Sequence, residues 1–350
     1  MWDKLPAPVR RLFGLPELWR PPGKPAGSSA EGTLSYTLLY NLGLDSDTAY
    51  GLLERGPLPP RFRYRHWTVP KKDGNLREIA EPGPALKEAQ GRILSKLLKK
   101  ARPHQAALGF RRGCSIVDHA NAHAGATTII TADIQDFFPS TGYGRVRRWW
   151  EKRGYPALDA RLLTTLTTYR GALPQGAPTS PLLSNLVNWE LDATIDRFVR
   201  VSGGTYTRYA DDLAFSWAGG GSPPLNLEAF VRARLYEAGY TLHGRKGWHV
   251  WRRKDEPEVT GLILARDGTV ELPQAMRSLI RALDRSADPA DGRRLQGLRG
   301  FEAMVREQQG RELAFRRAGP QRSQPAAEES FRQRAFVFDD DDDDDEDDDE

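Results

Sequence analysis

The chain has 350 residues, long enough to bury a sizeable core in one large domain or a few closely joined subdomains. Its single cysteine excludes an internal disulfide framework and is typical of a reducing cytoplasm. No apolar run reaches the roughly 18 residues of a membrane span, and the N-terminus lacks the apolar segment of a secretory signal. We therefore expect a cytoplasmic protein with no membrane partner.

The formal net charge of +4 conceals a strong asymmetry along the chain. All 12 residues of 339–350 are acidic, so the rest of the chain carries 51 lysines and arginines against 35 acidic residues, a net charge of +16. A body this basic favours a polyanionic partner, and nucleic acid is the first expectation. Basic and aromatic residues are also mixed over 61–67 and 145–153, a composition that can hold phosphates and stack bases.

The first third of the chain alternates breaks with periodic segments. Proline, glycine and serine are concentrated over 21–32, which predicts a flexible connector after an N-terminal segment. Asp73-Gly74 is a strong turn signal between two strand-like runs, so a hairpin is expected there. The expected elements are a helix over 33–53, strands over 62–69 and 76–80, and a helix over 85–101.

The remaining chain mixes strand and helix signals, which predicts the α+β class. The expected strands are 129–133, 205–208, 213–217, 248–252 and 259–264. The expected helices are a basic-aromatic segment ending near 154, then 157–169, 182–199, 227–238 and an arginine-rich region over 273–317 with a break at 287–292. After residue 319 the composition is typical of disorder, and it ends in the acidic run.

Two adjacent carboxylates, Asp211 and Asp212, lie between the strand-like runs 205–208 and 213–217, which predicts a hairpin with the pair at its tip. Such a pair is also common in turns and on solvated faces. In a partly closed site the two charges would repel unless a cation such as Mg²⁺ neutralised them. Asp133 ends another apolar run. Three carboxylates from neighbouring strands suit two metals about 4 Å apart and in-line phosphoryl transfer, so we expect a nucleotidyl transferase.

Several segments, in the same order, resemble those of reverse transcriptases and, within that family, the bacterial retron type. The resemblance covers roughly residues 60–265, and Tyr209-Ala210-Asp211-Asp212-Leu213 is its most characteristic part. The other segments are Arg77-Glu78-Ile79, Ala107-Leu108-Gly109-Phe110, Asp133-Ile134-Gln135-Asp136-Phe137-Phe138-Pro139-Ser140, Leu173-Pro174-Gln175-Gly176-Ala177-Pro178-Thr179-Ser180-Pro181, and Gly239-Tyr240-Thr241-Leu242 leading to Lys246.

Two further segments favour the retron branch. Val259-Thr260-Gly261-Leu262 is similar to a short signature that retron enzymes carry. The segment 119–123 is similar to the retron pattern Asn-Ala-x-x-His, but His119 stands where Asn is expected, and His243 is a second such departure. Other bacterial reverse transcriptases, of the abortive-infection or CRISPR-linked type, and a non-catalytic RNA-binding module are the alternatives.

The resemblance implies a right-hand polymerase fold with fingers, a palm built of an antiparallel sheet plus helices, and a helical thumb. The expected divisions are an N-terminal segment and connector over 1–32, fingers and palm over 33–265, a thumb over 266–318 and a disordered acidic tail over 319–350.

The resemblance also implies roles for individual residues. Asp133, Asp211 and Asp212, with the Ile134 carbonyl, are expected to hold two Mg²⁺ ions, for which Mn²⁺ could substitute. Lys246 is expected to protonate the leaving pyrophosphate, although a simple phosphate contact is an equally open role.

The expected nucleotide-binding residues come from four of the segments and the hairpin turn. Phe138 matches the family's steric gate against a 2′-hydroxyl, whereas its neighbour Phe137 is expected in the core. Arg77 would hold the triphosphate, and for Lys72 a solvated turn is the competing interpretation. The full set is Lys72, Arg77, Phe138, Gln175, Gly176 and Tyr209.

The partners that the resemblance implies are a structured non-coding RNA that serves as template and primer, its DNA product, deoxynucleoside triphosphates (dNTPs) and an effector protein in anti-phage defence. The product would be single-stranded DNA joined to RNA (msDNA). The arginines of 273–317 are expected to recognise that RNA or, alternatively, to follow any duplex.

Overall fold

The computed structural model describes residues 32–54, 58–70, 74, 76–244, 247–252, 255–286 and 288–318. The first elements are helices α2 (Tyr36–Leu42) and α3 (Ser46–Leu53), the 3-10 turn η2 (Pro60–Phe62), strands β1 (Tyr64–Pro70) and β2 (Leu76–Pro82), helix α4 (Pro84–Arg92) and the π-helical turn η3 (Ile93–Leu97). Then follow α5 (Ile116–Asn121), β3 (Thr128–Asp133), α6 (Phe137–Ser140), α7 (Tyr143–Lys152), α8 (Ala157–Thr167), α9 (Ser180–Val187) and α10 (Trp189–Val201).

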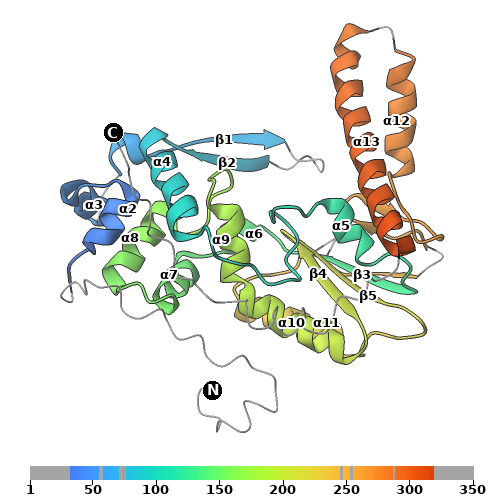
Figure 1. Cartoon of the computed structure of the whole chain (residues 1–350), viewed down its shortest axis with the longest axis horizontal. Coiled ribbons are helices and arrows are strands. Elements are labelled where there is room, and N and C mark those ends of the chain that lie inside the picture. Colours follow the sequence, from blue (N-terminus) through green and yellow to red (C-terminus); the bar gives the residue numbers. More distant parts are fainter. Residues whose placement is uncertain are drawn as a thin grey trace, which may run out of the picture.

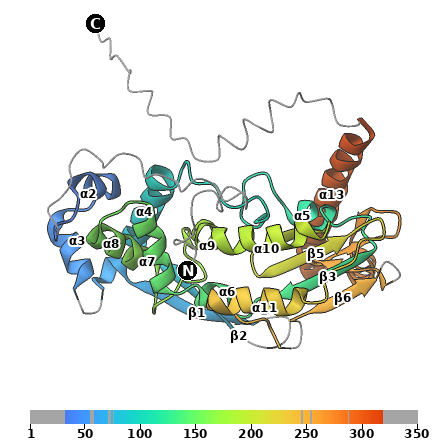
Figure 2. The ribbon, with the colours of Figure 1, turned by 90° about the horizontal axis from the view of Figure 1, so that it is seen from below.

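The last elements are β4 (Thr205–Tyr209), β5 (Asp212–Trp217), α11 (Leu227–Glu237), β6 (His249–Arg252), β7 (Glu258–Val259), β8 (Leu262–Leu264), β9 (Val270–Glu271), α12 (Gln274–Asp284) and α13 (Pro289–Ala318). Helices α2, α3 and α8 lie at one end of the molecule and the α12–α13 hairpin at the other, in both views (Figures 1 and 2).

Helices gather around the antiparallel β1–β2 hairpin at the first end of the molecule (Figure 1). Local signals set the helix ends: the Ser35 hydroxyl accepts a hydrogen bond from the Leu38 N–H, and the Asp45 carboxylate accepts one from the Thr48 N–H at 2.8 Å. Gly43, in the left-handed region at φ 64°, ends α2. The buried leucines of α2 and α3 join those of α4, α8 and α9 in one hydrophobic cluster.

A four-stranded antiparallel sheet, the central sheet, has the strand order β4-β5-β3-β6. Successive side chains of a strand point to opposite faces. Leu213, Phe215 and Trp217 therefore pack in one core with residues of α10 and α11, whereas Ala214 packs on the other face with residues of α5 and the small β7-β8-β9 sheet. With both faces covered, only the strand ends are open for chemistry.

Three expected elements are interrupted. The helix predicted over 33–53 is the two helices α2 and α3, because Gly43 ends α2 and Asp45 caps the start of α3. The strand predicted over 259–264 is a hairpin of β7 and β8, because Thr260 and Gly261 form a turn with φ of 51° and 78°. The helix predicted over 182–199 is two helices that meet at Asn188. The Asn188 side-chain amide donates to the Ser184 carbonyl at 2.9 Å and to the Tyr240 hydroxyl at 2.8 Å. The second bond connects the point where the two helices meet to Tyr240, which packs in the core beneath the central sheet.

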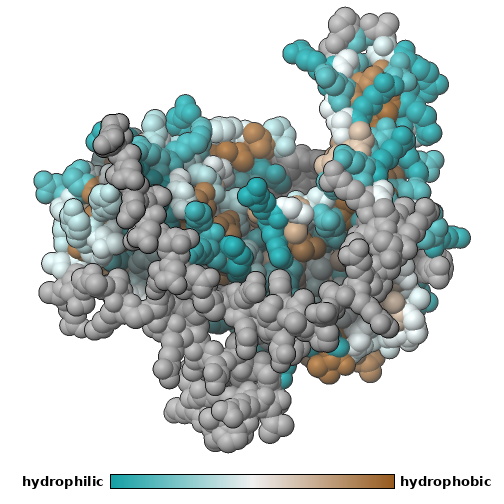
Figure 3. Space-filling view, viewed as in Figure 1, coloured by the Kyte–Doolittle hydropathy of each residue, from teal (hydrophilic) through white to brown (hydrophobic). Residues whose placement is uncertain are grey.

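The antiparallel α12–α13 hairpin projects from the small sheet (Figures 1 and 2). Helix α13 contacts α5 and β9, and Ile280 and Val305 belong to the same buried cluster as residues of α5 and the small sheet. Hydrophilic residues cover most of the visible surface of the hairpin around an apolar strip (Figure 3). No helix in the described part of the chain is long and apolar enough to cross a bilayer. The mixture of antiparallel sheets and helices confirms the predicted α+β class.

Candidate active site at the end of the central sheet

Three carboxylates meet where β3 ends and β5 begins. Asp133, the last residue of β3, is paired in register with Asp212, the first residue of β5. Asp211 precedes it in a two-residue turn, and its carbonyl accepts the Ile134 N–H at 3.0 Å. Directly opposite residues of an antiparallel pair have Cβ atoms about 5 Å apart. The structure thus brings together the three acidic residues that the motifs singled out, and all three are half-exposed.

The chemistry of this donor set fits Mg²⁺, which prefers carboxylate and carbonyl oxygens. Among the described residues, no three His, Cys, Asp or Glu side chains are gathered closely enough to enclose an ion by themselves. Mg²⁺ is commonly held by one or two carboxylates together with substrate phosphates rather than by an all-protein cage. Asp133, Asp211, Asp212 and the backbone of the buried Ile134 are therefore suited to a metal that a nucleotide completes.

The turn between β4 and β5 has an unusual backbone. Tyr209 and Asp212 pair across it, and Ala210 adopts a left-handed conformation with φ 58°. Such a conformation costs a residue other than glycine about 1–3 kcal/mol and persists only where its surroundings hold it. The strained residue is the neighbour of Asp211, within the Tyr209–Leu213 segment that is the most characteristic of the motifs.

One of the surroundings that hold the turn is the segment 106–109, which lies along β4. The Arg208 N–H donates to the Ala106 carbonyl at 2.7 Å, and the Leu108 N–H donates to the Arg208 carbonyl at 2.8 Å. A Cβ on Gly109 would lie 2.6 Å from the backbone nitrogen of Ala210, so only glycine fits there without a shift. The turn thus depends on a segment about 100 residues away in the sequence, one that the motifs also singled out.

The nucleotide-binding candidates lie on β2 and on the loop before α9. Arg77 is exposed on β2, opposite Val69. The Gln175 carbonyl accepts the Ala80 N–H at 2.7 Å, and a Cβ on Gly176, which has φ 119°, would lie 2.9 Å from the Ala80 carbonyl oxygen. This close docking places the loop against the strand that carries Arg77. Lys72 and Lys246 lie outside the described residues.

Aromatic side chains lie around the turn. Phe138 is half-buried and Phe137 is buried, in line with the expectation that Phe137 belongs to the core. The Phe110 ring lies 5.8 Å from the Phe138 ring and 6.4 Å from the Tyr209 ring, and it is 43% exposed. Burial raises the pKa of Tyr209, which keeps its hydroxyl neutral. The motif containing Phe110 was recognised, but the residue itself was not singled out because nothing local shows which aromatic faces the site.

Two histidines, His119 on α5 and His123 just after that helix, lie behind the same hairpin. His123 shares hydrogen bonds with the Ser216 hydroxyl at 2.7 Å and the Thr207 hydroxyl at 2.6 Å. His119 contacts the Thr260 hydroxyl and lies with its ring 5.8 Å from the Tyr209 ring. Burial lowers the pKa of His119 to about 3, so it is neutral. The two segments with retron-like sequences, 119–123 and 259–262, therefore contact each other.

Residues 69–264 match the family model described as "Reverse transcriptase (RNA-dependent DNA polymerase)". The Retron Mx162 reverse transcriptase of Myxococcus xanthus is 34% identical over 278 residues, which cover 69% of this chain and 57% of the relative. For the Retron Ec86 reverse transcriptase of Escherichia coli the identity is 35% over 208 residues, covering 59% and 64%. The chain therefore spans less than two thirds of the length of these two relatives.

The Retron Ec73 reverse transcriptase of Escherichia coli is 30% identical over 243 residues, which cover 65% of this chain and 75% of the relative. A solved structure of apo telomerase from Candida tropicalis, truncated from the C-terminal domain, shows a limited similarity, with 11% identity, a TM-score of 0.44 and coverage of 61% of this chain and 56% of that chain. The resemblance seen in the motifs is confirmed: the chain belongs to the reverse transcriptase (RNA-dependent DNA polymerase) family, and its relatives place it with the retron type.

Proposed function

We propose that this chain is an RNA-directed DNA polymerase of retron type. It uses a structured non-coding RNA as template and primer, makes single-stranded DNA joined to that RNA (msDNA), and acts with an effector protein in anti-phage defence. The observation that carries the proposal is the pairing of Asp133 with Asp212 beside Asp211 at the open end of the central sheet, in a chain of this family. A module that only binds RNA has no need to hold three repelling carboxylates together.

In this proposal Asp133 and Asp211 hold two Mg²⁺ ions, with Asp212 and the Ile134 carbonyl completing the set. The bound metals lower the pKa of the attacking hydroxyl and stabilise charge on the leaving pyrophosphate. The chain's own contribution is positioning: the strand ends hold the carboxylates between the primer terminus and the triphosphate. Lys246 acts as the general acid or as a phosphate contact.

Residues of β2 and of the loop before α9 hold the nucleotide against the carboxylates of the central sheet. The guanidinium of Arg77 on β2 binds the triphosphate, with Lys72 beside it. The Gln175–Gly176 loop lines the pocket and is seated on β2, where the missing Cβ of Gly176 leaves room for the Ala80 carbonyl. Tyr209 and Phe138 border the sugar, and the Phe138 ring excludes a 2′-hydroxyl.

The RNA partner is bound in part by the α12–α13 hairpin. Its exposed arginines are suited to phosphate contacts, which makes the affinity salt-dependent. They are Arg277, Arg281, Arg285, Arg293, Arg294, Arg299 and Arg306.

The test is to express the chain with its native upstream DNA, extract nucleic acid, treat it with RNase and look for a discrete short single-stranded DNA. The matched control is Asp211→Asn. A discrete species that is lost in the control is the expected result, and sequencing it identifies the template. Extension of a supplied primer–template without such a species would keep the polymerase and exclude the retron product. Inactivity in both assays would favour the RNA-binding module.

A further inference from the structure

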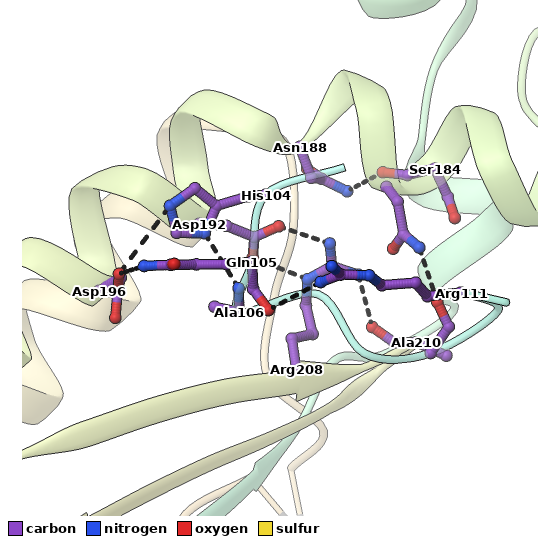
Figure 4. Close-up of polar contacts among 12 residues, drawn as sticks. His104, Gln105, Ala106, Arg111, Ser184, Asn188, Asp192, Asp196, Arg208 and Ala210 are labelled. Carbon is purple, nitrogen blue, oxygen red and sulfur yellow. Dashed lines mark hydrogen bonds and ion pairs between the residues drawn. The ribbon is translucent and has the colours of Figure 1, made fainter. Parts of the chain in front are cut away.

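Arg208, the residue before the Tyr209–Asp212 segment, has a completely buried side chain. Its partner is Asp192 on α10, which is also completely buried (Figure 4). Two hydrogen bonds join them: Nε donates to Oδ1 at 2.8 Å and Nη2 donates to Oδ2 at 2.6 Å. The Tyr206 hydroxyl donates to the same Oδ1 at 2.9 Å. Burial alone would lower the pKa of Arg208, but the charge and hydrogen bonds of Asp192 outweigh it and raise the pKa above its usual value.

The guanidinium also bonds to the turn itself. Its Nη1 donates to the Ala210 carbonyl at 3.1 Å, so Arg208 lies between Asp192 and the turn (Figure 4). That carbonyl belongs to the peptide plane that joins Ala210 to Asp211. Because the plane is rigid, the bond fixes the direction in which the Asp211 backbone leaves the left-handed Ala210. A hydrogen bond from a charged donor is strong enough to hold such a strained residue.

We propose that Arg208, with Asp192 as its counter-ion, is a positioning residue that sets the orientation of Asp211 relative to Asp133 and Asp212. The inference rests on the proposed polymerase function. The side-chain contacts of Arg208 and Asp192 include neither Arg77 nor Gln175, so we expect the network to act on the rate of nucleotide addition and on metal binding more than on the affinity for the nucleotide.

The competing interpretation is that the ion pair only joins β4 to α10. Replacing a buried ion pair with apolar residues of similar size often leaves stability unchanged, whereas removing one partner leaves an uncompensated charge. An apolar replacement of the whole network therefore separates the two roles. It preserves the packing between strand and helix, but it supplies no donor to the Ala210 carbonyl.

The experiment uses the full chain carrying Arg208→Met, Asp192→Leu and Tyr206→Phe together. Single-nucleotide primer extension gives kcat and the KM for the dNTP. A titration with Mg²⁺ gives the Mg²⁺ midpoint, the concentration at which the rate is half-maximal. We expect kcat to fall about 100-fold, as when catalytic groups are misplaced by about 1 Å, and the Mg²⁺ midpoint to rise, while KM at saturating Mg²⁺ changes far less than kcat. Hydrogen exchange of the peptide covering 205–217 measures the turn without metal or substrate, and it should become faster.

Asp196→Asn is the matched control, since Asp196 is a buried carboxylate four residues further along α10 that bonds to Arg200 and Gln105 instead. It should leave kcat and hydrogen exchange of the turn unchanged. Native kcat in the folded triple variant would overturn the proposal.

If the triple variant does not fold, Arg208→Lys takes its place. A single ammonium cannot replace the guanidinium's bidentate pairing with Asp192 and its bond to Ala210 at once. We expect at least a tenfold loss of kcat in this variant, and native kcat would contradict the proposal. A wild-type chain that extends no primer would overturn the proposed function, and this role with it.

Discussion

Asp133 and Asp212 face each other across β3 and β5, and Asp211 adjoins them in a turn that holds Ala210 in a left-handed conformation. Like charges at paired positions destabilise a sheet. Their presence at the open end of an otherwise well-packed sheet is therefore a cost in stability that a cation would offset. At the scale of single residues, this predicts that charge can be removed here without loss of the fold.

We expect Asp133→Asn to lower the rate of nucleotide addition more than about 100-fold, because a neutral amide holds the metals that stabilise the developing charge more weakly than a carboxylate does. The melting temperature should be unchanged or higher, because a repelling charge is removed. Primer extension and thermal unfolding check this. Asp136→Asn is the matched control: Asp136 is exposed in the same motif, its φ of 47° suits Asn, and activity should persist. Normal activity of Asp133→Asn would contradict the assignment.

Phe138→Ala should relax discrimination against ribonucleotides by about 10–100-fold, the range typical of pocket-size selectivity. The quantity to measure is the ratio of kcat/KM for dNTP and for the ribonucleotide. Phe137→Leu serves as the control, since Phe137 is buried and packs against Tyr240. That variant should lower stability and leave the ratio unchanged. An unchanged ratio in Phe138→Ala would exclude the gate.

At the scale of elements, the site depends on segments that support the β4–β5 hairpin from both sides. The segment 106–109 lies along its edge, and behind it lie His119 of α5 and His123, which follows that helix. Each support depends on residues that its surroundings constrain. Gly109 has no space for a Cβ, and burial keeps the two histidines neutral. Each makes a separate prediction.

Gly109→Ala should reduce nucleotide addition by about 100-fold, because the added Cβ would displace the backbone of Ala210 and a shift of about 1 Å in a catalytic group has effects of this size. Gly91→Ala is the control. Gly91 lies in α4 with open space around it, and the change should stabilise the protein by up to about 1 kcal/mol without altering activity. Equal activity of the two variants would show that the contact with the turn is unimportant.

The buried histidines predict a pH dependence of stability. With its folded pKa lowered to about 3, His119 stays neutral, whereas the unfolded chain binds a proton below about 6.5. The unfolded state then binds more protons, so the free energy of unfolding falls as pH drops below that value, by about 1.4 kcal/mol per unit. His119→Asn should reduce the slope between pH 6 and pH 5 by about that amount in urea denaturation. An identical slope would contradict the burial of a neutral imidazole.

At the scale of the whole molecule, the basic body and the acidic run 339–350 have opposite charges. Carboxylates at this density along a chain can compete with nucleic acid for basic surfaces at low ionic strength. Deleting 339–350 should raise the affinity for non-cognate RNA at low salt and have little effect at high salt, as measured by filter binding. Replacing the 12 residues with Ser and Gly separates charge from length and should have the same effect. Unchanged affinity in both variants would leave only a solubility role.

Local patterns predicted much of the site. Alternating residues around Asp211 and Asp212 indicated a hairpin because strand periodicity and turn chemistry act over a few residues. The break in the helix predicted over 182–199 was missed for the opposite reason. Asn188 ends α9 through a contact with Tyr240, which is 52 residues away, and no local pattern contains it.

By itself, the amino-acid sequence determined which residue types stand at each strand end and turn, and with them the chemistry open to the site. Only the tertiary structure decided that Asp133 pairs with Asp212, that the Gln175 loop docks on β2, and that Arg208 is buried. An arginine in a sequence is expected at the surface. It is buried here because folding brings Asp192 and the Ala210 carbonyl within hydrogen-bond distance, and together they replace the water that the guanidinium loses.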